Sequence, residues 1–282
     1  MGRRLGQHFL ANPAILDAIV AALEPQPEDV VIEIGPGRGT LTRRLAPRVA
    51  HVIGIEKDRA LAAALSGEVS RETGDVKRET MDPLPPNVTV VPADALEADW
   101  ARLISEPASH LSRLPFHGFK VIGNIPYYIT SPLIEKALSA PLPNLVVFLM
   151  QKEVAERLAA PPGSKTFGAL SAGVQSVAAV ERLFPVRRGA FQPPPRVDSA
   201  VVRLRPLADP LVTGQEQPEW RRFLAALFSQ RRKQISRSLR AVTGWDKDAV
   251  EGLLRRLDLD PASRPEVLQP HELVRIFRAV TR

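Results

Sequence analysis

A short apolar run that ends in a glycine-rich turn constrains the fold of this chain more than any other feature. The run 30–34 is mostly β-branched, and glycines follow it at positions 35, 37 and 39 before a helical pattern begins. Glycine has no Cβ, so such a turn lets the backbone bend sharply and lets a ligand touch it. Thr40 stands where the dinucleotide-binding pattern requires its third glycine. The turn therefore suits a nucleoside without phosphates, although a purely structural turn is an equal alternative.

Short apolar runs alternate with helical patterns through the first two thirds of the chain. We expect strands at 30–34, 49–55, 88–92, 120–123 and 145–150, and helices at 14–23, 41–45, 60–65, 132–138 and 153–158. Two later strands are expected at 174–186 and 197–205, on either side of the segment FQPPP. This alternation predicts an α/β fold with a parallel sheet and helices on both faces. The polar segment 66–87 is expected to be an exposed excursion from it.

The composition changes after Arg205. The segment PLADPLVTGQEQP has the character of a linker, and only helical periodicity follows from Glu219 onward. We therefore expect two domains, one at 1–206 that contains the sheet and a small all-helical one at 207–282.

Charge and cysteine content narrow the classes of partner and site. The 282 residues carry a formal net charge of +7, which favours nucleic acid as a partner and acidic membrane surfaces second. The alternative is that the positive excess only maintains solubility. There is no cysteine, so disulfides and cysteine-based metal sites are excluded and a reducing cytoplasm is indicated. The longest apolar runs, such as LVVFLM, are too short to cross a bilayer.

Two acids end successive predicted strands. Glu56 lies about 20 residues beyond the glycine turn, where an acid commonly binds ribose hydroxyls, and Asp94 could accept a hydrogen bond from an adenine amino group. Each acid alone could be a solvated strand end. Together they favour an adenosine ligand without pyrophosphate, and S-adenosylmethionine fits better than NAD.

The segment NIPYYI follows the fourth strand. The Asn124 side-chain oxygen and a nearby carbonyl could accept both N–H groups of an adenine amine, and Pro126 would stiffen the loop. Tyr127 could stack on a base that has left its own stack. A turn with both tyrosines packed on the core is the alternative.

With these motifs in order, the whole chain resembles the KsgA-type family of small-subunit ribosomal RNA adenine dimethyltransferases. The resemblance rests on six segments: LGQHFLANP (5–13), VIEIGPGRGTLT (31–42), NIPYYIT (124–130), FLMQKEVAERL (148–158), FQPPPRVDSAVVRL (191–204) and FSQRRKQISRSL (228–239). It implies a class I, Rossmann-like methyltransferase sheet with a small helical C-terminal domain. It also implies methyl transfer from S-adenosylmethionine to N6 of two adjacent adenosines, in the hairpin loop near the 3′ end of 16S rRNA.

The resemblance assigns roles to residues at matching positions. The implied S-adenosylmethionine-binding residues are His8, Leu10, Gly35, Glu56, Asp94 and Asn124. Asn124 and Tyr127 would hold the target base, and Phe191 would supply a second aromatic face to it. Tyr128 stands where the family commonly has asparagine, which leaves its role open.

A basic run in the tail is expected to contact RNA phosphates. The candidate residues are Arg231, Arg232, Lys233 and Arg237, and the spacing of Lys233, Arg237 and Arg240 would put those three on one face of a helix. A solvated surface is the more common interpretation of such a run when it is considered alone.

The resemblance also sets the expected partners. The substrate would be small-subunit rRNA or a precursor of the 30S subunit, and the protein is expected to be a cytoplasmic monomer that needs no metal. A further role in subunit assembly is compatible with the same resemblance. Two alternatives remain: a large-subunit rRNA adenine methylase, and a non-catalytic assembly or transcription factor on the same fold.

Overall fold

The computed structural model describes residues 8–67, 83–110 and 118–281, without the side chains of 106–110. The excursion predicted at 66–87 and the start of the motif at 5–13 therefore lie largely outside the described residues. By contacts the chain divides into two units, 1–152 with 182–205 and 153–181 with 206–282. By these contacts the segment 153–181 belongs with the C-terminal helices, although the sequence placed it in the first domain. The boundary at residue 206 between two folding domains stays a prediction.

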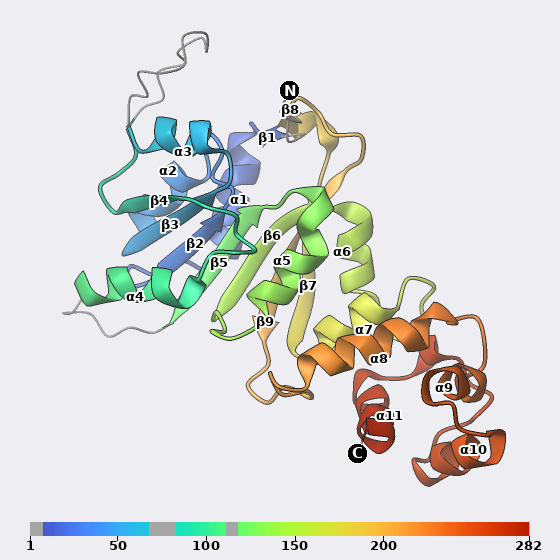
Figure 1. Cartoon of the computed structure of the whole chain (residues 1–282). Helices are drawn as coiled ribbons and strands as arrows, with labels where there is room; N and C mark the ends of the chain where they lie inside the picture. Colours follow the sequence, from blue (N-terminus) through green and yellow to red (C-terminus); the bar gives the residue numbers. More distant parts are fainter. Residues whose placement is uncertain (1–7, 68–82, 111–117, 282) are drawn as a thin grey trace. The chain divides into compact units, whose positions relative to one another are not determined.

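Unit 1 is built on a seven-stranded sheet with the order β4-β3-β2-β5-β6-β9-β7 (Figure 1). The strands are β2 (Val30–Ile34), β3 (His51–Glu56), β4 (Val88–Pro92), β5 (Phe119–Asn124), β6 (Leu145–Gln151), β7 (Ala178–Val186) and β9 (Ser199–Pro206). The first five in this order run parallel, and β9 is antiparallel to β6. The α/β sheet expected from the sequence is therefore confirmed.

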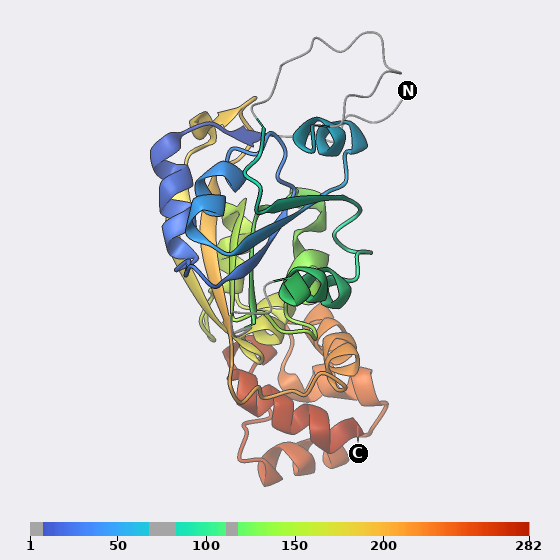
Figure 2. The same cartoon turned by 90° about the vertical axis from the view of Figure 1, so that its left-hand side faces the viewer.

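The five strands β2 to β6 run parallel because the helices between them return the chain to the same edge of the sheet. The helices of unit 1 are α1 (Pro13–Ala22), α2 (Thr42–Leu45), α3 (Arg59–Leu65), α4 (Trp100–His110) and α5 (Thr130–Ala137). Helices α1 and α2 lie on one face of the sheet, and α4 and α5 lie on the other (Figures 1 and 2). The first face buries a core in which Leu16 and Ile19 of α1 pack with Val31, Ile122 and Val147 of the strands.

A second, two-stranded sheet joins distant parts of unit 1. β1 (Phe9–Leu10) is antiparallel to β8 (Phe191–Gln192), and Ala11 N–H donates to the carbonyl of Ala190 at 2.9 Å. This pairing brings the start of the described chain beside the proline-rich segment.

Unit 2 is formed mainly by α6 (Lys152–Leu158), α7 (Ala169–Gln175), α8 (Gln217–Ser229), α9 (Ile235–Thr243), α10 (Lys247–Arg256) and α11 (Pro270–Thr281). Trp220 of α8 packs against Phe277 of α11, with ring centroids 5.3 Å apart, and its Nε1 donates to Ser176 Oγ at 3.0 Å. Glu216 accepts hydrogen bonds from Nε and Nη2 of Arg278, both at 3.0 Å, so an ion pair joins the start of α8 to α11 as well.

Two expectations about elements were wrong. The run 174–186 is not one strand, because α7 occupies its first residues and β7 begins at Ala178. The basic residues 231–233 do not lie on a helix: α8 ends at Ser229 and α9 begins at Ile235, after an extended Gln234 with ψ 148°.

Candidate active site

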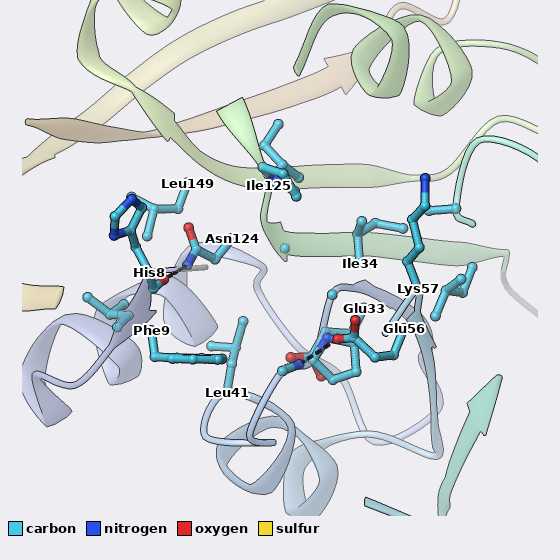
Figure 3. Close-up of a pocket in the computed structure, with 18 of the residues that line it drawn as sticks. His8, Phe9, Glu33, Ile34, Leu41, Glu56, Lys57, Asn124, Ile125 and Leu149 are labelled. Carbon is cyan, nitrogen blue, oxygen red and sulfur yellow. Dashed lines mark hydrogen bonds between the residues drawn. The ribbon is translucent and has the colours of Figure 1, made fainter. Parts of the chain in front are cut away.

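A cavity of about 300 Å³ opens at the carboxyl ends of the parallel strands of unit 1. Its walls come from the ends of β2, β3 and β5, from the N-terminal segment and from the loop after β4; Figure 3 shows eighteen of the lining residues. Open α/β sheets bind ligands at this edge, and the volume lies at the lower end of the usual range for small-molecule sites. The cavity therefore lies at the edge of the sheet that the sequence motifs indicate.

The glycine turn after β2 forms one wall of the cavity. Gly35 and Gly37 have φ values of 65° and 59°, in the left-handed region that favours glycine. A Cβ on Gly37 would also lie only 3.0 Å from the ring of Phe9. The turn therefore requires glycine at position 37 for both its conformation and its close approach to the N-terminal segment.

Glu56 at the end of β3 holds this turn. The side chain is 5% exposed; its Oε2 accepts from Gly37 N–H at 3.0 Å and its Oε1 accepts from Asp58 N–H at 2.9 Å. Burial is the main cause of the raised pKa of Glu56, and these backbone hydrogen bonds oppose it. A carboxylate has about four acceptor positions, so Glu56 can fix the turn and still accept hydrogen bonds from a ligand.

Glu33 is a site residue that the sequence analysis missed. It lines the cavity from β2 and is 2% exposed, and its Oε2 has no hydrogen-bond partner among the described residues. Burial, with the neighbouring charge of Glu56 as a smaller contribution, raises the pKa of Glu33 to about 7. An acid inside the buried run VVIEI was the available signal, because it is costly to bury a carboxyl group among apolar residues.

Asp94 lines the cavity but already has partners. Lys57 Nζ lies 2.6 Å from its Oδ2, and its Oδ1 accepts from Leu96 N–H at 2.9 Å. The hydrogen bond from Lys57 holds the pKa of Asp94 below its usual range. Lys57 is half exposed and lines the same part of the cavity, so any group that binds Asp94 also meets this ammonium.

Asn124 and Tyr127 form the opposite side of the cavity. Asn124 Nδ2 donates to the carbonyl of His8 at 3.0 Å, and Figure 3 shows both residues across the cavity from Glu33 and Glu56. The Tyr127 hydroxyl lies 2.8 Å from Ser199 Oγ, and burial raises the pKa of Tyr127.

His8 packs beside the Tyr127 ring. Their ring centroids are 6.3 Å apart with an interplanar angle of 29°. His8 Nδ1 lies 2.8 Å from the carbonyl of Pro193, which can only accept, so Nδ1 is the protonated nitrogen. Leu10, two residues later, is 5% exposed and also lines the cavity.

Phe191 is not brought to the cavity. Its backbone pairs with that of Leu10, and its side chain is 4% exposed within the hydrophobic core. In this structure the ring is part of the core and has no free face, so the second aromatic face expected from Phe191 is not present.

The four predicted RNA-binding residues lie in unit 2. Arg231, Arg232 and Lys233 occupy the exposed turn between α8 and α9, and Arg237 is exposed on α9. Lys233 therefore does not share a helical face with Arg237 and Arg240, because the helix begins only after it. We call Arg231, Arg232 and Lys233 the basic turn.

The sequence of this chain matches the model of a known protein family. The sequence model of the family described as ribosomal RNA adenine dimethylase matches residues 2–281. The chain belongs to this family. The fold is that of the class I S-adenosylmethionine-dependent methyltransferases.

Curated relatives and solved structures are similar over nearly the whole chain. The ribosomal RNA small subunit methyltransferase A of Latilactobacillus sakei is 39% identical over 97% of this chain and 88% of its own length. The protein of that name from Syntrophotalea carbinolica is 37% identical, over 99% and 96%. A dimethyladenosine transferase from Plasmodium falciparum superposes with a TM-score of 0.75 at 28% identity, covering 95% of this chain and 96% of that one. The 23S rRNA methyltransferase ErmE superposes with a TM-score of 0.67, also at 28% identity, over 97% and 100%.

The part of the chain that the structure describes contains neither a candidate membrane span nor a candidate metal site. No helix there is long and apolar enough to cross a membrane. No group of three or more histidine, aspartate or glutamate residues there could hold a metal ion.

Proposed function

We propose that this protein transfers methyl groups from S-adenosylmethionine to N6 of two adjacent adenosines, in the 3′-terminal hairpin loop of 16S rRNA, giving dimethyladenosines. One observation carries the proposal: the glycine turn with Glu56 and the NIPYYI loop with Asn124 line a single cavity. The curated relatives described above, named as small-subunit methyltransferases, support the choice of substrate. We infer that the protein acts in the cytoplasm, on the rRNA of the small subunit or its precursor.

The cavity fits S-adenosylmethionine. This molecule has a cationic sulfonium and ammonium at one end. Glu33 Oε2 has no hydrogen-bond partner among the described residues and provides a buried acceptor, whose ionisation such a cation would favour. Glu56 would accept from the ribose hydroxyls, while Leu10 and the backbone at Gly35 would line the pocket. S-adenosylmethionine supplies an electrophilic methyl group when it is bound.

The NIPYYI loop would orient the adenine amine. That amine is a poor nucleophile, because its lone pair is delocalised into the ring. If Asn124 Oδ1 and a backbone carbonyl of the loop accept its two N–H groups, the lone pair is directed away from them and toward the methyl group. The hydrogen bond from Asn124 Nδ2 to His8 favours this role, since it leaves the oxygen as the free end of the amide. The Tyr127 ring is held by Ser199 and would stack on the target base.

The reaction does not need a strong general base. The attacking amine becomes acidic only once it carries the new methyl group, and its proton can then pass to water. The chain's contribution is therefore positioning rather than proton abstraction, in line with the large effect of orientation on such reactions.

The proposal is tested by giving the protein labelled S-adenosylmethionine with undermethylated small subunits, large subunits or free 16S rRNA. We expect label on two adjacent adenosines of the small-subunit hairpin loop, recovered as dimethyladenosine. Label on large-subunit rRNA alone would instead identify the protein as a large-subunit methylase. No label on any RNA, with intact binding of small subunits, would identify it as a non-catalytic assembly factor.

A further inference from the structure

Two consecutive tyrosines at the cavity have opposite environments. Both line it, and both belong to the short 3₁₀ turn Tyr127–Ile129. Such a turn has about three residues per turn, so successive side chains point about 120° apart. Tyr127 is held by Ser199 and His8, whereas the Tyr128 side chain is 62% exposed.

Tyr128 is unusually exposed for a large aromatic side chain. Five large hydrophobic residues are exposed among those that the structure describes: Tyr128, Leu142, Val197, Trp245 and Val267. Tyr128 is the most exposed of these, and none of the other four lines the cavity. An aromatic ring left in water at the mouth of a binding cavity is a site for another flat, apolar group.

Tyr128 and Lys57 both line the cavity and interact electrostatically. The pKa of Lys57 is raised mainly by Asp94, and the phenol of Tyr128 adds a smaller contribution of the same sign. Tyr127, by contrast, lies beside His8. The two rings thus have different neighbours, and Lys57, which is half exposed and paired with Asp94, adds a positive charge to the lining.

We propose that Tyr128 stacks on the nucleobase adjacent to the adenine that is being methylated, and so positions the RNA strand at the mouth of the cavity. The inference rests on the proposed function, because it concerns the same site and the same RNA. A base that enters the cavity leaves its neighbour without a stacking partner, and an exposed aromatic ring replaces that partner without regard to base identity. Lys57, which lines the same cavity, would supply a positive charge for a phosphate of the strand.

The kinetic test compares Tyr128→Ala, Tyr128→Phe and the wild type. The control is Leu142→Ala, which removes an exposed apolar side chain that does not line the cavity. Stacking on one base predicts a rise in the KM for undermethylated small subunits of about 5- to 150-fold in Tyr128→Ala. Tyr128→Phe should restore the wild-type KM, because it keeps the ring, and Leu142→Ala should not change it. The affinity for S-adenosylmethionine should stay constant in all of them.

A spectroscopic test separates stacking from a structural effect. Hairpin-loop RNA is prepared with 2-aminopurine in place of the adenosine next to the target. Its fluorescence in the complex should be quenched by the wild type and by Tyr128→Phe, and be brighter with Tyr128→Ala.

Three results would overturn the inference. An unchanged KM with equal fluorescence would remove the role of the ring. Weakened S-adenosylmethionine binding at constant KM for RNA would mean that Tyr128 covers the cofactor instead. A KM that Tyr128→Phe fails to restore would assign the effect to the hydroxyl group. Each result is a comparison with an active wild type, whereas failure of the proposed function would appear as a wild type that labels no small-subunit adenosine.

Discussion

The side-chain amide of Asn124 donates a hydrogen bond to the backbone carbonyl of His8, with 3.0 Å between the two atoms. The residues are 116 positions apart in the sequence, so this contact fixes the N-terminal wall of the cavity to the end of β5. It also fixes the orientation of the amide, with Oδ1 as the atom that this contact does not use. The same hydrogen bond therefore holds the cavity wall in place and orients the amide for its proposed role in catalysis.

The first prediction follows from this contact. Asn124→Ala removes the acceptor for the adenine amine and should lower kcat by at least about 100-fold, the usual effect of removing one preorganised polar group from a transition state. The dissociation constant for S-adenosylmethionine, measured by calorimetry, should change far less. Near-normal methylation by this variant would refute the role proposed for Asn124.

Glu56 is predicted to bind the ribose. Glu56→Gln should weaken S-adenosylmethionine binding by about 1.5–3 kcal/mol, the contribution of a charge-assisted hydrogen bond. The glutamine keeps the size of the side chain and one acceptor oxygen, which can retain the hydrogen bond from Gly37 N–H at the expense of the one from Asp58 N–H. Glu28→Ala is the control, because Glu28 is an exposed glutamate that does not line the cavity. Equal affinities of Glu56→Gln and wild type in calorimetry would argue against the ribose contact.

Glu33 should make stability depend on pH in the cofactor-free protein. Its pKa is raised from 4.5 to about 7, mainly by burial, so the folded state keeps a proton that the unfolded chain releases above pH 4.5. The resulting stabilisation is complete below pH 4.5 and is lost as the pH rises to about 7, at most about 3 kcal/mol. Denaturant unfolding between about pH 4.5 and pH 8 should show a smaller decline in Glu33→Gln than in wild type, because Glu56, whose pKa burial also raises, still contributes to it. Parallel profiles for the two proteins would contradict the raised pKa.

The basic turn is predicted to contact phosphates. Replacing Arg231, Arg232 and Lys233 with alanine should weaken binding of small subunits. It should also flatten the log–log dependence on salt by about 0.7–0.9 for each phosphate that is no longer bound, because fewer counterions are released. S-adenosylmethionine affinity should not change, since the cavity lies in unit 1. Arg255→Ala, at an exposed position on α10, is a single-charge control on the same unit. A salt titration in which the triple variant and wild type give coincident lines would make the basic turn an ordinary solvated surface.

Most strands of unit 1 can be predicted from the sequence, because each one is marked by a short run of neighbouring apolar residues. Five apolar runs give the parallel strands to within a few residues, and polar residues at their ends locate the cavity edge. The pairing of β1 with β8 leaves no such signal, since these two-residue strands lie about 180 positions apart. Residues 174–177 fit a strand as well as the end of α7, because a short apolar run is compatible with either a strand or a buried helix.

The remaining errors concern side chains and turns rather than strands. The family resemblance implies that Phe191 faces the target base, whereas its side chain lies in the core, because the direction of a side chain depends on strand pairing that the motif does not specify. The break between α8 and α9 is hard to predict because the segment FSQRRKQISRSL contains neither glycine nor proline. Glu33 was missed because the apolar residues around it were interpreted only as a strand. Its carboxyl group is nevertheless the unusual feature of that strand.

The pairing of β1 with β8 delays completion of the cavity during synthesis. His8 contacts the carbonyl of Pro193, and the Tyr127 hydroxyl contacts Ser199, so two walls of the cavity depend on residues made after the whole parallel sheet. On a translating ribosome, the glycine turn and the NIPYYI loop leave the exit tunnel well before these partners do. A nascent chain that ends before Ser199 therefore has the parallel strands of unit 1 without a finished cavity. We therefore expect the binding site to be completed only late in translation.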